Sequence, residues 1–86
     1  MFLRSCPMRD IAETIARQHG VTLSEIRSLS RRRPAAWARQ EVISALVLSG
    51  RSQSAAARFV NRTYWTAAHA LEAVSERRAL AKLEAA

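Results

Sequence analysis

The sequence predicts an all-α domain of five helices, and three features of its composition support this prediction. The 86 residues include only two glycines and two prolines, too few for the many tight turns of an antiparallel sheet. Good helix formers, above all alanine, leucine, arginine and glutamate, are abundant. Apolar residues make up 49% of the chain, and the large share of alanine among them favours one small core of closely packed helices.

The first two helices are marked by their ends. Apolar residues recur from Met8 onward at i, i+3, i+4, i+7 and i+8, the spacing of one helix face, and Gly20 is suited to stop that helix. Thr22 and Glu25 have the spacing of a capping box, in which each side chain bonds the other residue's backbone. A short second helix should therefore begin at Leu23, turned sharply from the first.

The third and fourth helices are bounded in the same way. Pro34 suits the first turn of a helix that ends at Gly50, and Ser52 is the expected N-cap of the next helix. Both helices carry apolar residues at helical spacing, which should face the core. These are Val42, Ile43, Leu46 and Val47 in the third helix, and Ala55, Ala56, Phe59 and Val60 in the fourth.

The last helix should follow a turn at Asn61 and Arg62, with Thr63 as its cap. Its expected inner face consists of Tyr64, Ala67, Ala68, Leu71 and Val74. Beyond Arg77 the apolar anchors are weak, and the helix end is expected to fray. The predicted organisation is an N-terminal extension (residues 1–7), one domain (residues 8–76) and a C-terminal helix end or tail (residues 77–86).

The positive charge is concentrated in one segment. The chain carries fourteen Lys and Arg against seven Asp and Glu, a net charge of +7. Residues 27–62 contain eight arginines and a single acid, Glu41, so this segment holds the whole excess and the rest of the chain is neutral. Such clustering is typical of a face that binds a polyanion, whereas a generally basic composition would spread the arginines evenly.

Other classes of site are disfavoured by what the sequence lacks. Cys6 is the only cysteine, and with His19 and His69 as the only histidines a zinc site is hard to assemble. No paired carboxylates or Ser/His/Asp set stands out, so we expect no enzyme activity and no cofactor. The longest apolar run, residues 45–48, is far below the ~20 residues of a membrane span, and the start is too short for a secretory signal. We expect a soluble, cytoplasmic protein without a membrane or small-molecule partner.

The last two expected helices have the layout of a helix-turn-helix, whose second helix enters the DNA major groove. Leu71 is taken as the middle of the buried face, and successive residues turn by about 100°. The residues that then face away from the core are Arg62, Trp65, Thr66, His69 and Ala73. An exposed Trp65 suggests a contact with DNA, although it could also be a core residue of a slightly rotated helix or a dimer contact.

From about residue 10 to residue 74 the chain resembles the C-terminal DNA-binding domain (domain IV) of the bacterial replication initiator DnaA, a Trp-repressor-like helix-turn-helix fold. The resemblance lies in the first helix and in the segments VTLSEIRS, RPAAWARQ and NRTYWTAAHA. Arg39 and Gln40 stand where the family's Arg-Pro-Arg-Gln motif ends, with Ala38 in place of its proline. The family's signature Arg-Asp-His-Thr-Thr-Val here reads Arg62-Thr63-Tyr64-Trp65-Thr66-Ala67.

This resemblance implies roles for individual residues. It implies that Arg31 enters the minor groove and that Arg39 contacts the phosphate backbone. Three residues match the family's recognition helix, namely Arg62, Thr66 and His69. Thr63, Tyr64 and Trp65 depart from it at positions that the family uses to read bases, so the usual DnaA box should not be the target. No G-x-x-x-x-G-K-[ST] phosphate loop is present, and ATP hydrolysis is not expected.

We therefore expect a protein that binds double-stranded DNA. The candidate DNA-binding residues are Arg31, Arg32, Arg33, Arg39, Gln40, Arg51, Arg62, Thr63, Tyr64, Trp65, Thr66 and His69. The first interpretation is a site-specific transcriptional regulator, with the transcription machinery as a further partner. The alternative is replication initiation or its control at an origin-like site, with the replication machinery as a further partner. A second alternative is an adaptor that binds another protein through the Trp65 face.

Overall fold

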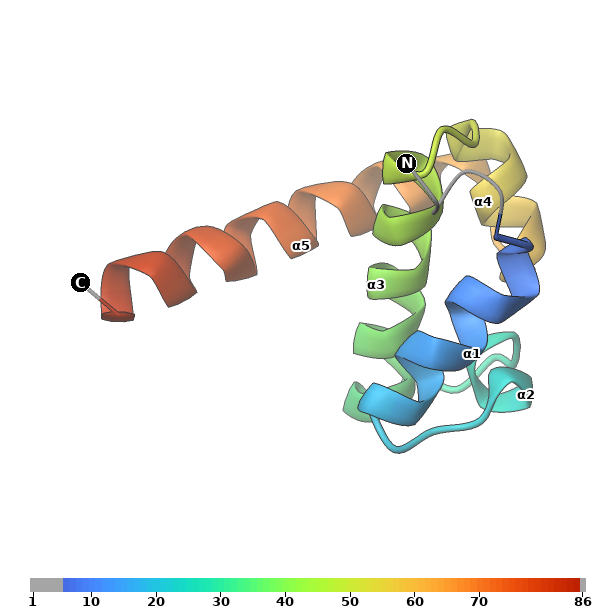
Figure 1. Ribbon diagram of the computed structural model, residues 1–86, viewed down its shortest axis with the longest axis horizontal. Coiled ribbons are helices and arrows are strands. Elements are labelled where there is room, and N and C mark those ends of the chain that lie inside the picture. The colour runs from blue at the N-terminus through green and yellow to red at the C-terminus, as the bar shows by residue number, and fades with distance from the viewer. Residues whose placement is uncertain (1–5, 86) are drawn as a thin grey trace.

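The computed structural model describes residues 6–85, which form five helices and no strand (Figure 1). This confirms the predicted all-α class. The helices are α1 (Met8–Gln18), α2 (Leu23–Ile26), α3 (Arg33–Leu48), α4 (Gln53–Phe59) and α5 (Tyr64–Ala85). None of the described helices is both long enough and apolar enough to cross a membrane.

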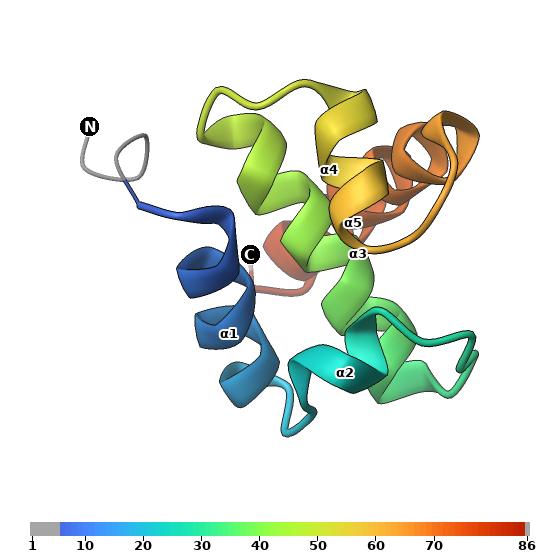
Figure 2. The ribbon, with the colours of Figure 1, turned by 90° about the vertical axis from the view of Figure 1, so that its right-hand side faces the viewer.

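Helix α3 lies at the centre and packs against all four other helices. Figure 2 shows α1 on one side of it and α4 and the start of α5 on the other, with α2 beneath its first turns. The core is made mainly of small residues and β-branched side chains, which lets the helices approach closely. The largest fully buried side chains are Ile26, Ile43, Leu46, Val42, Val60 and Val74.

The helix starts follow from local capping. Thr22 Oγ1 accepts a 3.1 Å hydrogen bond from the Glu25 amide, and Glu25 Oε1 accepts one from the Thr22 amide, so the predicted capping box is present. Ser52 accepts from the Ala55 amide as the N-cap of α4. These side chains satisfy amides that have no partner inside their helices, which fixes where the chain turns.

The buried face of α5 differs from the predicted one. Ala67, Ala70 and Val74 are buried, whereas Tyr64 is 49% exposed and Leu71 only partly buried. The reason is that α5 packs closely on both α3 and α4, so its two alanines rather than its larger side chains meet them. The buried face of α5 is thus rotated toward Ala70, relative to the face predicted from the sequence.

Helix α5 continues to Ala85, well beyond the point where fraying was expected. Arg77 and Arg78 anchor its middle, because both contact the carboxylate of Glu41 on α3, at 3.3 and 3.2 Å. Past these residues the helix extends away from the other four (Figure 1). The predicted C-terminal segment from residue 77 is thus the end of this helix as far as Ala85. In the predicted N-terminal extension, residues 1–5 lie outside the described part of the chain.

Candidate nucleic-acid interface

Two segments far apart in the sequence lie together at one side of the molecule. One is the basic loop, defined here as residues 27–33 between α2 and the start of α3, and the other is the turn before α5 (Figure 2). Arg62 Nη2 donates a 2.7 Å hydrogen bond to the Ser28 carbonyl. Asn61 Nδ2 donates a 3.2 Å bond to the Arg27 carbonyl. These bonds place the three consecutive arginines beside the first turn of α5.

Asn61 is important for this arrangement, although sequence reasoning assigned it only to a turn. Its φ of 59° is the only positive value at a non-glycine residue in the described part of the chain. Asparagine tolerates this left-handed conformation better than most residues, and here it ends α4 and redirects the chain into α5. The same side chain then reaches the basic loop. The signal that could have identified it is an asparagine directly after an apolar helix end.

Arg39 holds the basic loop from inside. Its side chain is buried, with only 6% of its surface exposed. The Nε atom donates a 2.6 Å hydrogen bond to the Ile26 carbonyl, and Nη2 lies 3.1 Å from the carbonyls of both Ser28 and Ser30. Burial lowers the pKa of Arg39 from its usual value, and the nearby charge of Arg62 lowers it further.

The prediction that Arg39 contacts the phosphate backbone is therefore wrong. Its Nε and Nη2 donors already bond backbone carbonyls of the loop, and the buried side chain does not face solvent. A guanidinium suits this task because its planar fork can satisfy several fixed carbonyls at once. Arg39 acts on the interface by positioning the loop.

The arginines of the loop itself are available. Arg31, Arg32 and Arg33 are all exposed, and none of them is paired with an acid among residues 6–85. The guanidinium of Arg33 lies 5.0 Å from the centre of the Trp37 ring, and that of Arg77 lies 4.5 Å from it. Trp37 thus links the start of α3 to α5 through cation–π contacts, a link that the sequence did not reveal.

The first turn of α5 presents the aromatic pair to solvent. Trp65 is 72% exposed, which excludes the core position left open from the sequence. Its ring packs edge-on against that of Tyr64, with centroids 5.8 Å apart. Thr63 caps the helix weakly, through a 3.4 Å contact with the Thr66 amide. His69 is exposed one turn farther along the same side.

Gln40 and Arg51 are less suited to the expected role. Gln40 Oε1 accepts a 2.5 Å hydrogen bond from Arg77, which ties it to α5. Gln40 nevertheless lines a small hollow together with Arg62, Thr66 and His69. Arg51 donates to Ser49 Oγ at 2.7 Å and to the Cys6 carbonyl at 2.6 Å. It follows the far end of α3, a helix that spans about 24 Å, and so does not join the residues of the loop. Apart from the buried Arg39, the other predicted residues lie in the basic loop or at the start of α5.

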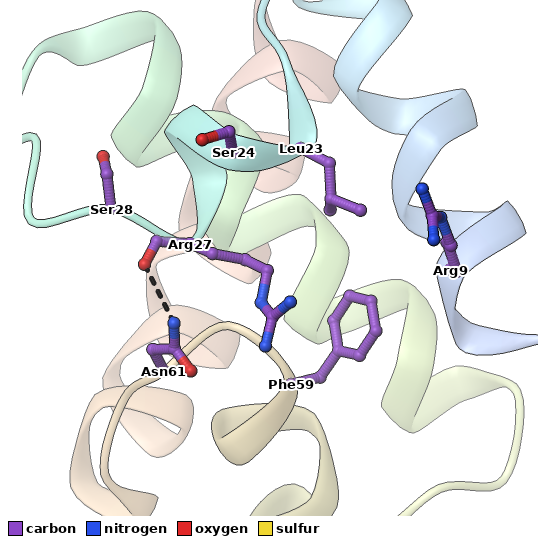
Figure 3. Close-up of a pocket in the computed structure, with 7 residues that line it drawn as sticks. All are labelled: Arg9, Leu23, Ser24, Arg27, Ser28, Phe59 and Asn61. Carbon is purple, nitrogen blue, oxygen red and sulfur yellow. Dashed lines mark hydrogen bonds between the residues drawn. The ribbon is translucent and has the colours of Figure 1, made fainter.

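A cleft with a volume of about 640 Å³ lies next to the basic loop, between α1, α2 and α4 (Figure 3). Arg27 extends along it with its guanidinium 5.5 Å from the centre of the Phe59 ring, and Arg9 faces it from α1. Arg27 was counted among the clustered cations but not among the site residues. Its carbonyl accepts the bond from Asn61, and its exposed side chain adds a fourth cation to the loop.

Comparison with protein-family models, with curated proteins and with solved structures finds no match for this chain. The resemblance to the DnaA domain therefore rests on the sequence motifs quoted above. A function has to be inferred from the arrangement of the residues themselves.

Proposed function

We propose that this protein binds double-stranded DNA through one surface made of the basic loop and the first turn of α5. The observation that carries this proposal is the 2.7 Å hydrogen bond from Arg62 to the Ser28 carbonyl, which holds the two segments side by side. A basic loop beside the exposed start of a helix offers both phosphate contacts and base contacts. No other part of the described chain combines these features.

The shape of this surface fits a helix-turn-helix docked on DNA. Helices α4 and α5 are joined by a tight turn, and α5 begins with exposed side chains. The major groove of B-DNA is about 12 Å wide and admits such a helix. With the start of α5 in the groove, the neighbouring basic loop meets the phosphate backbone and the adjacent groove. Arg31 is the residue that we assign to the minor groove.

The charge of the surface supports the same partner. Arg27, Arg31, Arg32 and Arg33 are exposed within one loop, and no ion pair with an acid neutralises them among residues 6–85. Neutralising phosphates releases condensed counterions and gives affinity without sequence preference. Sequence preference should come chiefly from Tyr64 and Trp65 at the start of α5, with a further contribution from Arg31 in the minor groove. An indole in the major groove can contact thymine methyl groups.

Site-specific regulation of transcription in the bacterial cytoplasm is the role we propose, with control of replication at an origin-like site as the alternative. Selection of preferred sites from a random duplex pool tests both, because it reports whether a defined sequence is enriched. Enrichment of a standard DnaA box would contradict the proposed reading by Tyr64 and Trp65. A pool without any enriched sequence would leave only non-specific DNA binding.

The exposure of Trp65 also supports a second function, binding of another protein through this face. A large exposed aromatic side chain is typical of interface hot spots. The two functions differ in their dependence on the loop arginines. Replacing Arg31, Arg32 and Arg33 by alanine should abolish DNA binding, whereas an adaptor would retain its protein partner. Wild-type protein with no measurable DNA affinity at low salt would overturn the DNA proposal.

A further inference from the structure

A second surface lies on the other half of α5, away from the proposed DNA contacts. Between the C-terminal half of α3 and α5 there is a groove with a volume of about 380 Å³. Leu71, Val74 and Ala79 contribute apolar surface to it, and Leu48 stands at its edge with 71% of its surface exposed. Farther along α5, Leu80 and Leu83 are 60% and 73% exposed. Exposed leucines beside an apolar groove mark a surface suited to contact with another helix.

The exposed charges between residues 72 and 82 follow an order along α5. The acids Glu72 and Glu76 come first, and the cations Arg78 and Lys82 follow, both of which line the groove. Arg78 also contacts Glu41 of its own chain, and Glu84 follows on another side of the helix. Glu72, Glu76 and Lys82 are exposed and form no ion pair with another residue in the described range 6–85. A helix that carries acid first and base second is complementary to a copy of itself in the opposite direction.

The spacing of small residues agrees with such pairing. Glu72, Ser75, Ala79 and Lys82 follow each other at intervals of three, four and three residues, which is the spacing of a two-helix seam, here with small residues at its middle and charged residues at its ends. Ser75 and Ala79 at the middle of this seam leave room for close approach of a second backbone. The buried Ala70 points elsewhere and stays packed on the core.

We propose that the occupant of the groove is α5 of a second copy of this chain, in antiparallel orientation. In this pairing the Arg77 residues of the two copies lie at the same position along the helix axis, and Ser75 lies opposite Ala79 of the second copy. Glu72 then lies opposite Lys82, and Glu76 opposite Arg78. Leu83 of each copy meets Leu71 of the other and covers the exposed Leu48 beside it. A parallel pair would instead bring like charges together, which is unfavourable. The homodimer is independent of DNA binding.

Sedimentation velocity of the wild-type protein tests this proposal directly. The proposed contact is limited to one groove and one helix of each copy, so we expect dimers to form at roughly micromolar concentration. A protein that stays monomeric up to about 1 mM would overturn the proposal and leave the groove to a helix of some other protein.

Charge reversal tests the register. Lys82→Glu and Glu72→Lys should each raise the dimer dissociation constant tenfold or more, about the effect of losing 1.4 kcal/mol. The combined variant restores opposite charges across the pair and should regain wild-type dimerisation. Glu84→Lys is the matched control, because Glu84 lies on the other side of α5 and should have no effect. All variants change exposed residues, and thermal melting checks that each one is folded. Failure of the combined variant to recover, or an equal effect of the control, would disprove this register.

Cross-linking tests the register of the antiparallel pair independently of charge. In a Cys6→Ser background, a Ser75→Cys copy mixed with an Ala79→Cys copy should form a disulfide on mild oxidation, because these positions face each other. Ala81→Cys lies on a different side of α5 and should not cross-link with Ser75→Cys. Equal yields for the two mixtures would show that the helices do not pair as proposed.

Discussion

Arg39 and Arg62 converge on one acceptor, the carbonyl oxygen of Ser28, with donor distances of 3.1 and 2.7 Å. Arg39 comes from the middle helix and Arg62 from the turn before α5, so a single carbonyl of the basic loop links both. The two guanidinium groups repel each other, which contributes to the lowered pKa of Arg39. The loop is therefore held by two arginines, of which Arg39 is buried and Arg62 stays partly exposed beside the first turn of α5.

Replacing Arg39 should affect folding first. Arg39→Ala leaves several loop carbonyls without their donors, and we expect the free energy of unfolding to fall by about 3 kcal/mol. Arg39→Lys keeps the charge but not the planar fork, and should recover only part of this loss. Urea denaturation measures both. Arg32→Ala is the control, since removal of this exposed side chain should weaken DNA binding without changing the free energy of unfolding. Unchanged stability of Arg39→Ala would refute the structural role.

DNA affinity should fall steeply with salt concentration. Each of the four exposed arginines of the basic loop displaces at most one condensed counterion, whether it meets a phosphate or lies in the minor groove, and each contributes a slope of about −0.9. The plot of log K against log[salt] should therefore have a slope of about −3.6. Fluorescence anisotropy with a labelled duplex measures it. A variant with Arg31 replaced by alanine should give a slope that is less steep by about 0.9. A flat plot for the wild-type protein would remove DNA as the main partner.

Arg31 and Arg32 should differ in their dependence on DNA sequence. Narrow, A·T-rich minor grooves have the strongest negative potential, so Arg31→Ala should lose most affinity on duplexes of this type. A phosphate contact carries no base information, and Arg32→Ala should weaken binding to all duplexes by a similar factor. Titrations with A·T-rich and G·C-rich duplexes compare the two variants. Equal losses on both duplexes for both variants would contradict the assignment of Arg31 to the minor groove.

Trp65→Ala separates DNA recognition from stability. The side chain is 72% exposed, so its removal should leave the melting temperature nearly unchanged. Loss of one good base contact costs roughly 1–3 kcal/mol, and specific DNA binding should weaken about tenfold or more. Thermal melting and titration with the selected site measure the two effects. Normal melting together with normal DNA binding would instead favour a protein contact at this face.

Local interactions account for the parts of the fold that the sequence predicted well. The capping box of Thr22 and Glu25 and the N-cap at Ser52 act within four residues, so the helix starts can be inferred from neighbouring residues alone. The outward position of Trp65 was also predicted, because helical periodicity separates it from the apolar residues of α5.

Only the tertiary structure decided how these helices meet. The rotation of α5 toward Ala70 depends on how closely α3 and α4 approach it, which no periodicity within α5 specifies. Arg39 appears in the sequence as one more cation of a basic segment. Its burial follows from loop carbonyls that come together only when α2 packs on α3. The sequence by itself determined which residues form helices and where the charge is concentrated. Long-range packing determined which arginines hold the structure and which remain free to bind, because a guanidinium donates to whichever acceptors the fold brings within reach.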